Sequence, residues 1–335
     1  MRELRLGPSR TPTPVPLRAV RRIAIAAVVA GVAVPLVRRR LGIPPAVAIA
    51  GAALAPAAFC LAVPRSRKRD IATCTLQMWA YVAAYKMPHG SDPEGLERRV
   101  KVDYPIVVDR ALGLGELPTV RLQRRLAVPG GFRGYEKALC FTHWVWFAVP
   151  HVALTFILFR HPERFPRAAV LTYGVFDIGA LCYWVIPTAP PWYASERGRL
   201  GEPADGSDGP IVRRMMVEYG EEFWRDAWGP LYSVLGGNPF AAMPSLHFAT
   251  SVMAATLLAE TGPQAGALGT AYAAGIGVAL VYLGEHYVAD LLAGLGLTLA
   301  VRSLDRPFVR APIASVGRRI GQLGERARAR PPGVG

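Results

Sequence analysis

The chain has 335 residues, of which 52% are hydrophobic and only 19% are charged, and its formal net charge is +15. Soluble domains are usually about one-quarter charged, so this composition argues against a soluble protein and favours an integral membrane protein. The arginines flank apolar blocks and form no single stripe. This pattern argues against a nucleic-acid partner and is typical of cytoplasmic loops that contact anionic membrane lipids.

The N-terminal part predicts a tail followed by a helical hairpin. Residues 1–22 are rich in arginine and proline, which predicts a disordered basic tail. The apolar stretches 23–37 and 41–63 predict a hairpin over residues 23–70. The first stretch is short for a membrane span, which needs about 20 residues. We therefore expect one or two extra transmembrane helices ahead of the main bundle.

Residues 71–303 predict an all-α, six-helix transmembrane bundle that forms the catalytic membrane domain. Its apolar stretches are 71–87, 138–159, 168–186, 244–259, 266–284 and 287–301. Two longer polar segments, 88–137 and 188–242, predict interfacial loops with short helices. Residues 304–335 predict a second basic, disordered tail.

The loop 188–242 contains one amphipathic stretch. Val212, Met216, Tyr219 and Phe223 recur at helical spacing, which predicts a helix on the membrane surface that starts at Pro210. It either covers a site or is a packing helix with no gating role.

A short polar stretch opens the apolar segment 244–259. Pro244 suits the first turn of a helix, and Ser245 and His247 follow it directly. The first turn has backbone N–H groups without intrahelical partners, and it attracts anions such as phosphate. The alternative is an N-terminal cap beside an incidental histidine.

A second histidine, His286, opens the segment 287–301, and Asp290 lies four residues later on the same helical face. A carboxylate bonded to one ring nitrogen fixes the tautomer and leaves the other nitrogen basic. Counting the spans places residues 190–193, Ser245–His247 and His286–Asp290 at one membrane surface. We expect His286 to be a nucleophile and His247 to be a proton donor.

Other ionisable residues within the apolar segments have a structural interpretation. His143, His151 and Asp177 could pair with one another inside the bundle. The four cysteines lie in or beside apolar segments and predict neither a disulfide framework nor a metal site.

The motifs resemble those of a known family. Pro-Ser-Leu-His (244–247) and His-Tyr-Val-Ala-Asp (286–290) are similar to the second and third signatures of the type-2 phosphatidic-acid phosphatase superfamily. Pro-Pro-Trp-Tyr (190–193) resembles the branch with the fungal inositol phosphorylceramide synthases, and the whole arrangement looks like its actinobacterial, inositolphosphotransferase-like members.

The resemblance implies a phospho-histidine at His286, with Asp290 as its partner and His247 as the acid, and it implies no metal or other cofactor. It also implies a substrate-phosphate site, for which the candidates are Ser245, Leu246, Pro191, Tyr193, Arg197, Arg213 and Arg214.

The chain departs from the wider superfamily at one cationic position. A Ser-Arg pair precedes the third-signature histidine in the superfamily, whereas this chain has Ala279 and Leu280 there. Phosphoryl transfer needs cationic stabilisation, so the charge must come from elsewhere. The candidates are Arg197, Arg199, Arg213, Arg214, Arg225 and Lys137.

The leading hypothesis is a membrane enzyme that transfers a phosphoryl or phospho-alcohol group on a lipid phosphate or diphosphate. Water as acceptor makes it a lipid phosphatase, and an inositol-type alcohol makes it a lipid phosphotransferase. The alternative is a non-catalytic transporter or scaffold that uses His286 and Asp290 as a relay. The loop 188–242 has five arginines against eight acids, so the positive-inside tendency predicts an extracytoplasmic site in a multi-pass plasma-membrane protein.

Overall fold

The computed structural model describes residues 17–91, 93–128, 130–201, 210–235, 238–305 and 322. Within these ranges all regular structure is helical, apart from two isolated bridges that link Thr188 to Lys101 and to Ala241. The chain divides into two compact units, residues 1–80 with 312–335, and residues 81–311. The predicted all-α fold class is confirmed.

The described part of the first unit contains α1 (Leu17–Val37), α2 (Pro45–Ala62) and the first half of α3 (Arg67–Ser91). α1 and α2 pack together through small buried residues, Ala24, Ala58 and Ala62. The first half of α3 also packs here: Trp79 Nε1, in the middle of that helix, donates to Gly31 O at 3.1 Å.

The predicted N-terminal tail is partly helical. α1 begins at Leu17, so residues 17–22 belong to a helix although the sequence suggested disorder. Arginine is a good helix former, and the basic residues there extend α1. Residues 1–16, and all of 306–335 except residue 322, lie outside the described residues, so the two tails stay predictions there.

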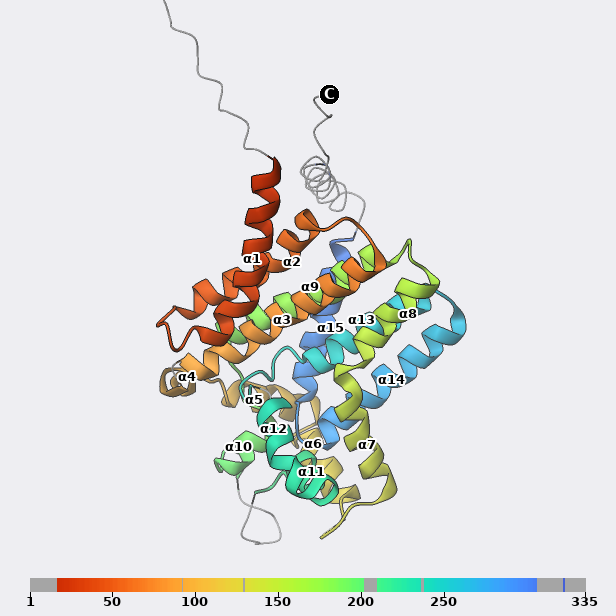
Figure 1. The fold of residues 1–335 in the computed structure, drawn as a ribbon. Coiled ribbons are helices and arrows are strands. Elements are labelled where there is room, and N and C mark those ends of the chain that lie inside the picture. The colour runs from red at the N-terminus through yellow and green to blue at the C-terminus, as the bar shows by residue number, and fades with distance from the viewer. Residues whose placement is uncertain are drawn as a thin grey trace, which may run out of the picture. The chain divides into compact units, whose positions relative to one another are not determined.

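The second unit contains the rest of α3 and five further long segments, and its centre is α13 (Leu246–Ala259). In Figure 1, α13 lies among the neighbours it contacts. These neighbours are α8 (Val149–Arg160), α9 (Phe165–Val185), α14 (Pro263–Tyr282) and α15 (Val288–Ser303). α7 (Gly134–Trp144) continues through η1 (Val145–Phe147) into α8. The six predicted apolar segments of the bundle are therefore all helical.

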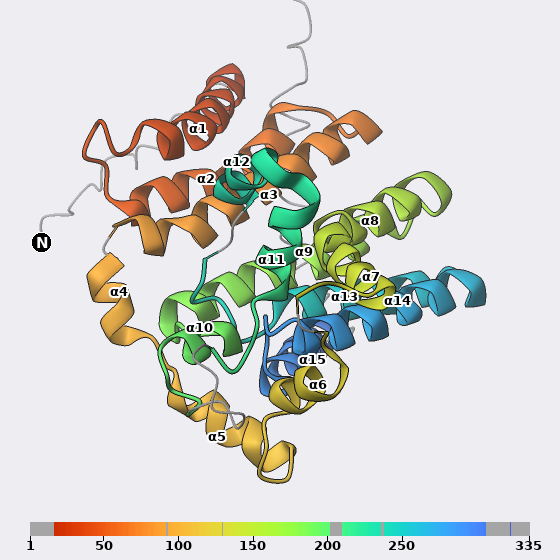
Figure 2. The ribbon, with the colours of Figure 1, turned by 90° about the horizontal axis from the view of Figure 1, so that it is seen from below.

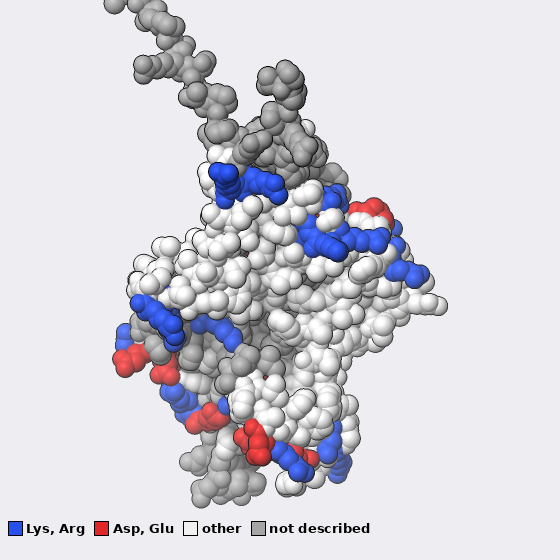
Figure 3. All heavy atoms as spheres, in the orientation of Figure 1, with Lys and Arg blue, Asp and Glu red and all other residues white. Residues whose placement is uncertain are grey.

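The spans differ in length. By length and composition α1, α2, α9 and α14 can each cross a membrane, and α7 with α8 makes a fifth span if this pair, bent by 55°, is counted as one. α13 and α15 are shorter, at 14 and 16 residues. On the face drawn in Figure 3, the charged side chains lie in a few separate groups, and uncharged residues make up most of the described surface.

An ion-pair network joins three helix ends on one side of the bundle. Arg167 near the start of α9 pairs with Glu260 after α13 and with Asp305 after α15. Arg302 in the last turn of α15 also pairs with Glu260, at 2.8 Å. The end of α9 and the starts of α13 and α15 therefore share the opposite side, as the count of spans predicts.

The two predicted interfacial loops are largely helical and lie at that opposite side (Figure 2). The first contains α4 (Pro93–Arg99), α5 (Asp103–Leu112) and α6 (Pro118–Leu126), and the second contains α10 (Pro191–Glu196), α11 (Met215–Trp224), η2 (Arg225–Ala227) and α12 (Trp228–Leu235). The amphipathic helix is α11, but it begins at Met215 and not at Pro210. Residues 210–214 are not helical, and Val212 among them packs on Gly284 in the turn between α14 and α15.

Candidate active site

The two motif histidines meet at the starts of α13 and α15. His286 Nε2 lies 3.1 Å from His247 Nδ1, and His286 Nδ1 lies 3.3 Å from Asp290 Oδ2. His286 is 3% exposed and Asp290 is 0% exposed. A proton on His286 Nδ1 that faces the carboxylate leaves Nε2 with its lone pair, to which His247 Nδ1–H donates. The arrangement is that of a nucleophile with an orienting acid and a proton donor.

The turn that carries His286 is shaped by Gly284. This residue has φ +80°, and a Cβ there would lie 2.6 Å from Val212 Cγ1. Only glycine tolerates both the left-handed backbone and the close packing of the 210–214 segment. Trp192 N donates to Gly284 O at 3.2 Å, so α10, with the Pro-Pro-Trp-Tyr motif, is attached to the same turn.

Two carboxylates cap α15 directly after His286. Asp290 Oδ2 accepts from Tyr287 N at 2.9 Å. Asp109 of α5 accepts from Val288 N at 3.0 Å and from Ala289 N at 2.8 Å. Burial raises the pKa of Asp109, and these two N–H donors partly offset the shift. The caps satisfy the free N–H groups of the helix and fix the direction in which His286 points.

Ser245 joins α13 to α15. Its Oγ accepts from Phe248 N at 3.3 Å, which makes it the N-cap of α13, and its N donates to Asp290 O at 2.9 Å. Pro244 precedes the helix, and the Met243–Pro244 peptide is cis. Gly294 permits the close approach, because a Cβ there would lie 2.6 Å from Ser245 O. Ser245 is thus a buried cap that holds the two motifs together, and the predicted phosphate contact of its hydroxyl stays a prediction.

Two rings enclose His247. The His143 ring centroid lies 4.8 Å from that of His247, and the Trp146 centroid lies 4.0 Å away. Trp146 is fixed by a 2.9 Å hydrogen bond from its Nε1 to Thr250 Oγ1. The sequence suggested that His143 and His151 belong to one buried structural cluster. In the structure His143 contacts His247, whereas His151 Nδ1 pairs with Phe147 O at 2.9 Å.

The segment 210–214 brings two arginines beside the His286 turn. Gln123 of α6 holds it: Gln123 Oε1 accepts from Arg213 N at 2.8 Å, and Gln123 Nε2 donates to Tyr282 O at 2.8 Å. The Arg213 guanidinium is occupied by Glu218 and by Val128 O. It therefore points away from the histidines.

Arg214 forms a longer ion pair, with Glu196 at 4.0 Å. Its guanidinium stacks on the Trp192 ring at 3.5 Å and donates to Tyr232 Oη at 2.7 Å, while its Nε is buried without a hydrogen-bond partner among the described groups. Burial raises the pKa of Glu285, the residue before His286, and the charges of Arg214 and His286 act in the opposite direction. Arg214 is therefore close enough to act electrostatically on the His286 turn.

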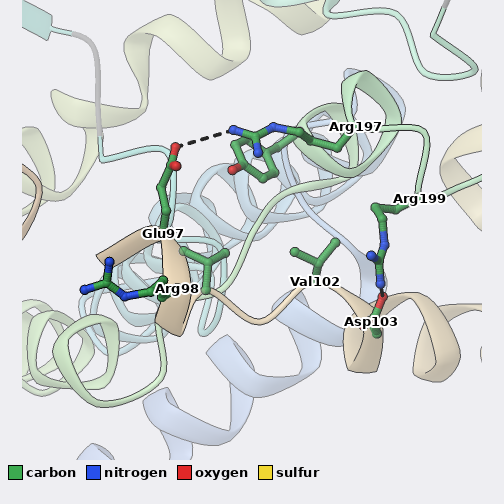
Figure 4. Close-up of a pocket in the computed structure, with 8 residues that line it drawn as sticks. Glu97, Arg98, Val102, Asp103, Arg197 and Arg199 are labelled. Atoms are coloured by element: carbon green, nitrogen blue, oxygen red, sulfur yellow. Dashed lines mark hydrogen bonds and ion pairs between the residues drawn. The ribbon is translucent and has the colours of Figure 1, made fainter. Parts of the chain in front are cut away.

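The other predicted arginines lie elsewhere. Arg197 pairs with Glu97 at 3.4 Å and Arg199 pairs with Asp103. Both line an open pocket of about 530 Å³ together with Arg98 (Figure 4). The remaining lining residues are Val100, Val102 and Tyr193. This pocket contains neither motif histidine and is not the catalytic centre.

The remaining predicted residues are buried or ion-paired, and a role for them in phosphate binding stays a prediction. Leu246 is 2% exposed, and Pro191 is buried at the first position of α10. Ala279 and Leu280 are both fully buried in the apolar core, which explains why no cation can enter at the positions of the family Ser-Arg pair. Lys137 pairs with Glu222 at 3.3 Å.

Sequence reasoning missed Asp109, Gln123 and Glu285. The signal for Asp109 was a single acid after the apolar run 105–108. Gln123 carried no signal, because its partners are backbone groups of residues far away in sequence. Among the described residues no group of three His, Cys, Asp or Glu side chains is arranged to hold a metal ion.

Comparison with known proteins agrees with this geometry. The sequence profile of the PAP2 superfamily matches residues 134–304, just over half of the chain. The chain belongs to the PAP2 superfamily. The PAP2 match includes α7 to α15 and therefore both histidines, Asp290 and Arg214.

Three curated relatives indicate which branch of the superfamily the chain resembles. The phosphoinositol dihydroceramide synthase of Bacteroides thetaiotaomicron is 30% identical over 157 residues, which is 46% of this chain and 50% of that protein. The inositol phosphorylceramide synthase of Candida albicans is 28% identical over 160 residues, 46% of this chain and 32% of that protein. The catalytic subunit of the same enzyme in Schizosaccharomyces pombe is 29% identical over 167 residues, 47% of this chain and 37% of that protein.

The matched regions thus span between about a third and a half of the length of these relatives. No solved structure matches the chain significantly. The resemblance to the branch with inositol phosphorylceramide synthases is confirmed.

Proposed function

We propose that the protein is a lipid phosphotransferase that moves a phosphoryl or phospho-alcohol group through a phospho-histidine at His286. The observation that carries the proposal is the contact of His286 with both His247 and Asp290, at 3.1 Å and 3.3 Å. The contact is built from separate helix starts and fixed by caps from α5 and α15. Such a constellation has an activated nucleophile, an orienting group and a proton donor.

In the first step His286 Nε2 forms a bond to phosphorus while the bond from phosphorus to the leaving oxygen breaks. His247 gives its proton to that oxygen, so an alcohol leaves. Asp290 stabilises the positive charge that develops on the His286 ring. In the second step the acceptor hydroxyl gives its proton to His247, its oxygen bonds to phosphorus, and the N–P bond breaks.

His247 Nδ1 occupies the position that phosphorus needs beside His286 Nε2. The two rings must therefore separate when a substrate binds. Tilted rings, His143 and Trp146, contact His247 on two sides. Among the described residues, the one hydrogen bond that its ring forms is to His286, so its movement breaks few contacts.

Arg214 is the cation that we assign to the developing phosphoryl charge. It lies in the segment that packs on the His286 turn, and its Nε is buried and unpaired within the described structure. Arg213, its neighbour, is already neutralised by Glu218 at 2.5 Å. Arginine suits this role because its planar fork binds phosphate oxygens in pairs.

The relatives favour an inositol-type head group. Their names combine phosphoinositol or inositol with a phosphorylceramide or dihydroceramide product. For this chain we propose a lipid phosphate, diphosphate or phosphodiester donor, with an inositol-type alcohol as the transferred or accepting group. Hydrolysis by water is the competing outcome of the same intermediate.

The relay alternative requires a polar path through the bundle. In the described α13 and α15, Thr250 donates to Leu246 O, Ser251 donates to His247 O, and Thr298 donates to Ala249 O. Each hydroxyl proton is thus held by a backbone carbonyl. This pattern supports an enzyme over a proton or ion relay.

The test is an assay of purified protein in detergent with a panel of lipid phosphates, diphosphates and a phosphoinositol lipid, with and without inositol or ceramide. We expect a new phospholipid product in the presence of the acceptor, and we expect His286→Ala to lose it while the protein remains folded. Full activity of His286→Ala would refute the mechanism. Glu260→Gln, at the other end of α13, is the matched control.

We place the active site on the extracytoplasmic side of the plasma membrane, because the loop 188–242 has more acids than arginines. A cysteine introduced at Arg197 should react with a membrane-impermeant maleimide in intact cells. Labelling only after lysis would reverse the orientation.

A further inference from the structure

A third histidine, His143, belongs to none of the motifs and yet lies against the proton donor. It occupies the last turn of α7, and its ring is tilted by 33° to that of His247. Trp146 is the other neighbour of His247, and it is anchored to Thr250. Since Trp146 is fixed, His247 can separate from His286 only by moving relative to His143, so the substrate phosphoryl group must come close to both rings.

Both nitrogens of His143 are buried and have no hydrogen-bond partner among the described groups. A buried polar atom without a partner is destabilising, and native proteins rarely retain two on one side chain. His151, the other membrane histidine of this helix pair, has Phe147 O as a partner of its Nδ1 at 2.9 Å, so only its Nε2 is buried without a described partner. The free nitrogens of His143 are therefore best explained by a group that arrives with the substrate.

We propose that His143 binds a non-bridging oxygen of the phosphoryl group and stabilises the charge that develops there. This inference rests on the proposed function. An imidazole always carries at least one N–H that can donate to a phosphate oxygen, and such a donor acts strongly where water is excluded. The apolar Ala279 and Leu280 stand where the wider superfamily has a Ser-Arg pair, so a donor from α7 fills a chemical need of this chain.

The arrival of an anion also favours the protonated form of His143. Three imidazoles so close together cannot all carry a charge, because like charges repel. A phosphate dianion relieves that repulsion. His143 should therefore add an ionisation to the pH profile of kcat, which reports the substrate complex, and a purely structural residue would not do so.

The test compares His143→Phe, which keeps a ring but removes both nitrogens, with His143→Gln, which keeps an N–H donor. His151→Phe is the matched control. We expect His143→Phe to lower kcat/KM and to weaken inhibition by orthovanadate, a mimic of five-coordinate phosphorus, each by about 10²-fold. His143→Gln should recover part of both losses, and His151→Phe should change either by less than about threefold.

Vanadate affinity and kcat/KM of His143→Phe that stay within about threefold of the unaltered protein would overturn the proposal. Equal losses in the Phe and Gln variants, with an unchanged pH profile, would also overturn it. If a variant does not fold, the unaltered protein decides: vanadate should protect His143 from carbethoxylation, read by peptide mass spectrometry, and an absence of protection refutes the contact.

The vanadate measurement separates this inference from the proposed function. Unaltered protein that binds vanadate through His143 but transfers no group would refute the phosphotransferase and leave the phosphate contact standing. Turnover that is lost in His286→Ala but kept in His143→Phe would support the phosphotransferase and refute the phosphate contact of His143.

Discussion

The helices α9, α13 and α15 are joined at both of their ends, but by different kinds of contact. At one end Arg167, Glu260 and Arg302 form partly exposed ion pairs in which every charge has a partner. At the other end the helices meet through buried backbone and carboxylate contacts around His286 and Asp290.

The difference lies in what is left unsatisfied. At the histidine end Asp290 Oδ1, both His143 nitrogens and Arg214 Nε are buried without a partner among the described groups. A helix end that serves only stability has no reason to keep such atoms. Single atoms of this kind also occur at Thr119 and His151, but four of them lie near His247 and His286, which makes this end the candidate ligand site.

Asp290→Asn should produce the largest effect on activity. The amide oxygen can still accept from Tyr287 N, so the cap of α15 persists, but the orienting charge on His286 is lost. We expect kcat to fall by about 10³–10⁴-fold, measured with the transfer assay. Asp305→Asn, at the far end of α15, is the control, and a similar loss there would mean that the helix as a whole is sensitive.

Arg214→Gln should follow, with kcat/KM reduced by about 10²–10³-fold because one cationic donor to the transition state is removed. Arg213→Gln should cost much less activity, since its guanidinium is held by Glu218. Equal effects of the two substitutions on kcat/KM would contradict the assignment of the cation to Arg214.

Gln123→Leu should affect stability and the site together. It removes the contacts to Arg213 N, Arg213 O and Tyr282 O and leaves buried backbone groups unpaired. We expect a loss of roughly 2–4 kcal/mol, seen as a lower apparent Tm in detergent. The exposed Gln264→Leu should leave the Tm unchanged; an unchanged Tm for Gln123→Leu would mean that the segment 210–214 is held by other contacts.

Arg167→Gln at the ion-pair end should have the smallest effect. Partly exposed ion pairs contribute about 0–1 kcal/mol each, and the catalytic side chains are at the opposite end. We expect a slightly lower apparent Tm and an unchanged kcat. A large loss of activity would show that the two ends are coupled through α13.

Much of this architecture could be predicted from the sequence, because apolar blocks and their count decide which helix ends share a side. That argument placed Ser245, His247, His286 and Asp290 together. In the structure Ser245 N donates to Asp290 O, and the two histidines contact each other, as expected. The domain boundaries and the roles of the site residues stay predictions.

The supports of the site could not be predicted in the same way. Asp109 and Gln123 act on backbone groups 179 and 159 residues away in sequence, and backbone groups look alike at every position of a sequence. The arginines could not be told apart from the sequence, because Arg197 and Arg214 have the same chemistry. Their neighbours in the structure distinguish them: Arg197 forms an ion pair in the pocket, whereas Arg214 lies beside the His286 turn.

The 55° bend between α7 and α8 has a consequence for how a lipid can react. Val145 and Phe147 at the bend are about half exposed, whereas His143 and Trp146 beside them touch His247. One helical turn thus separates the outer surface from His247. Under the proposed function, the apolar chains of a lipid substrate can remain in the bilayer while its phosphorus is attacked, so the reaction does not incur the cost of extracting those chains into water.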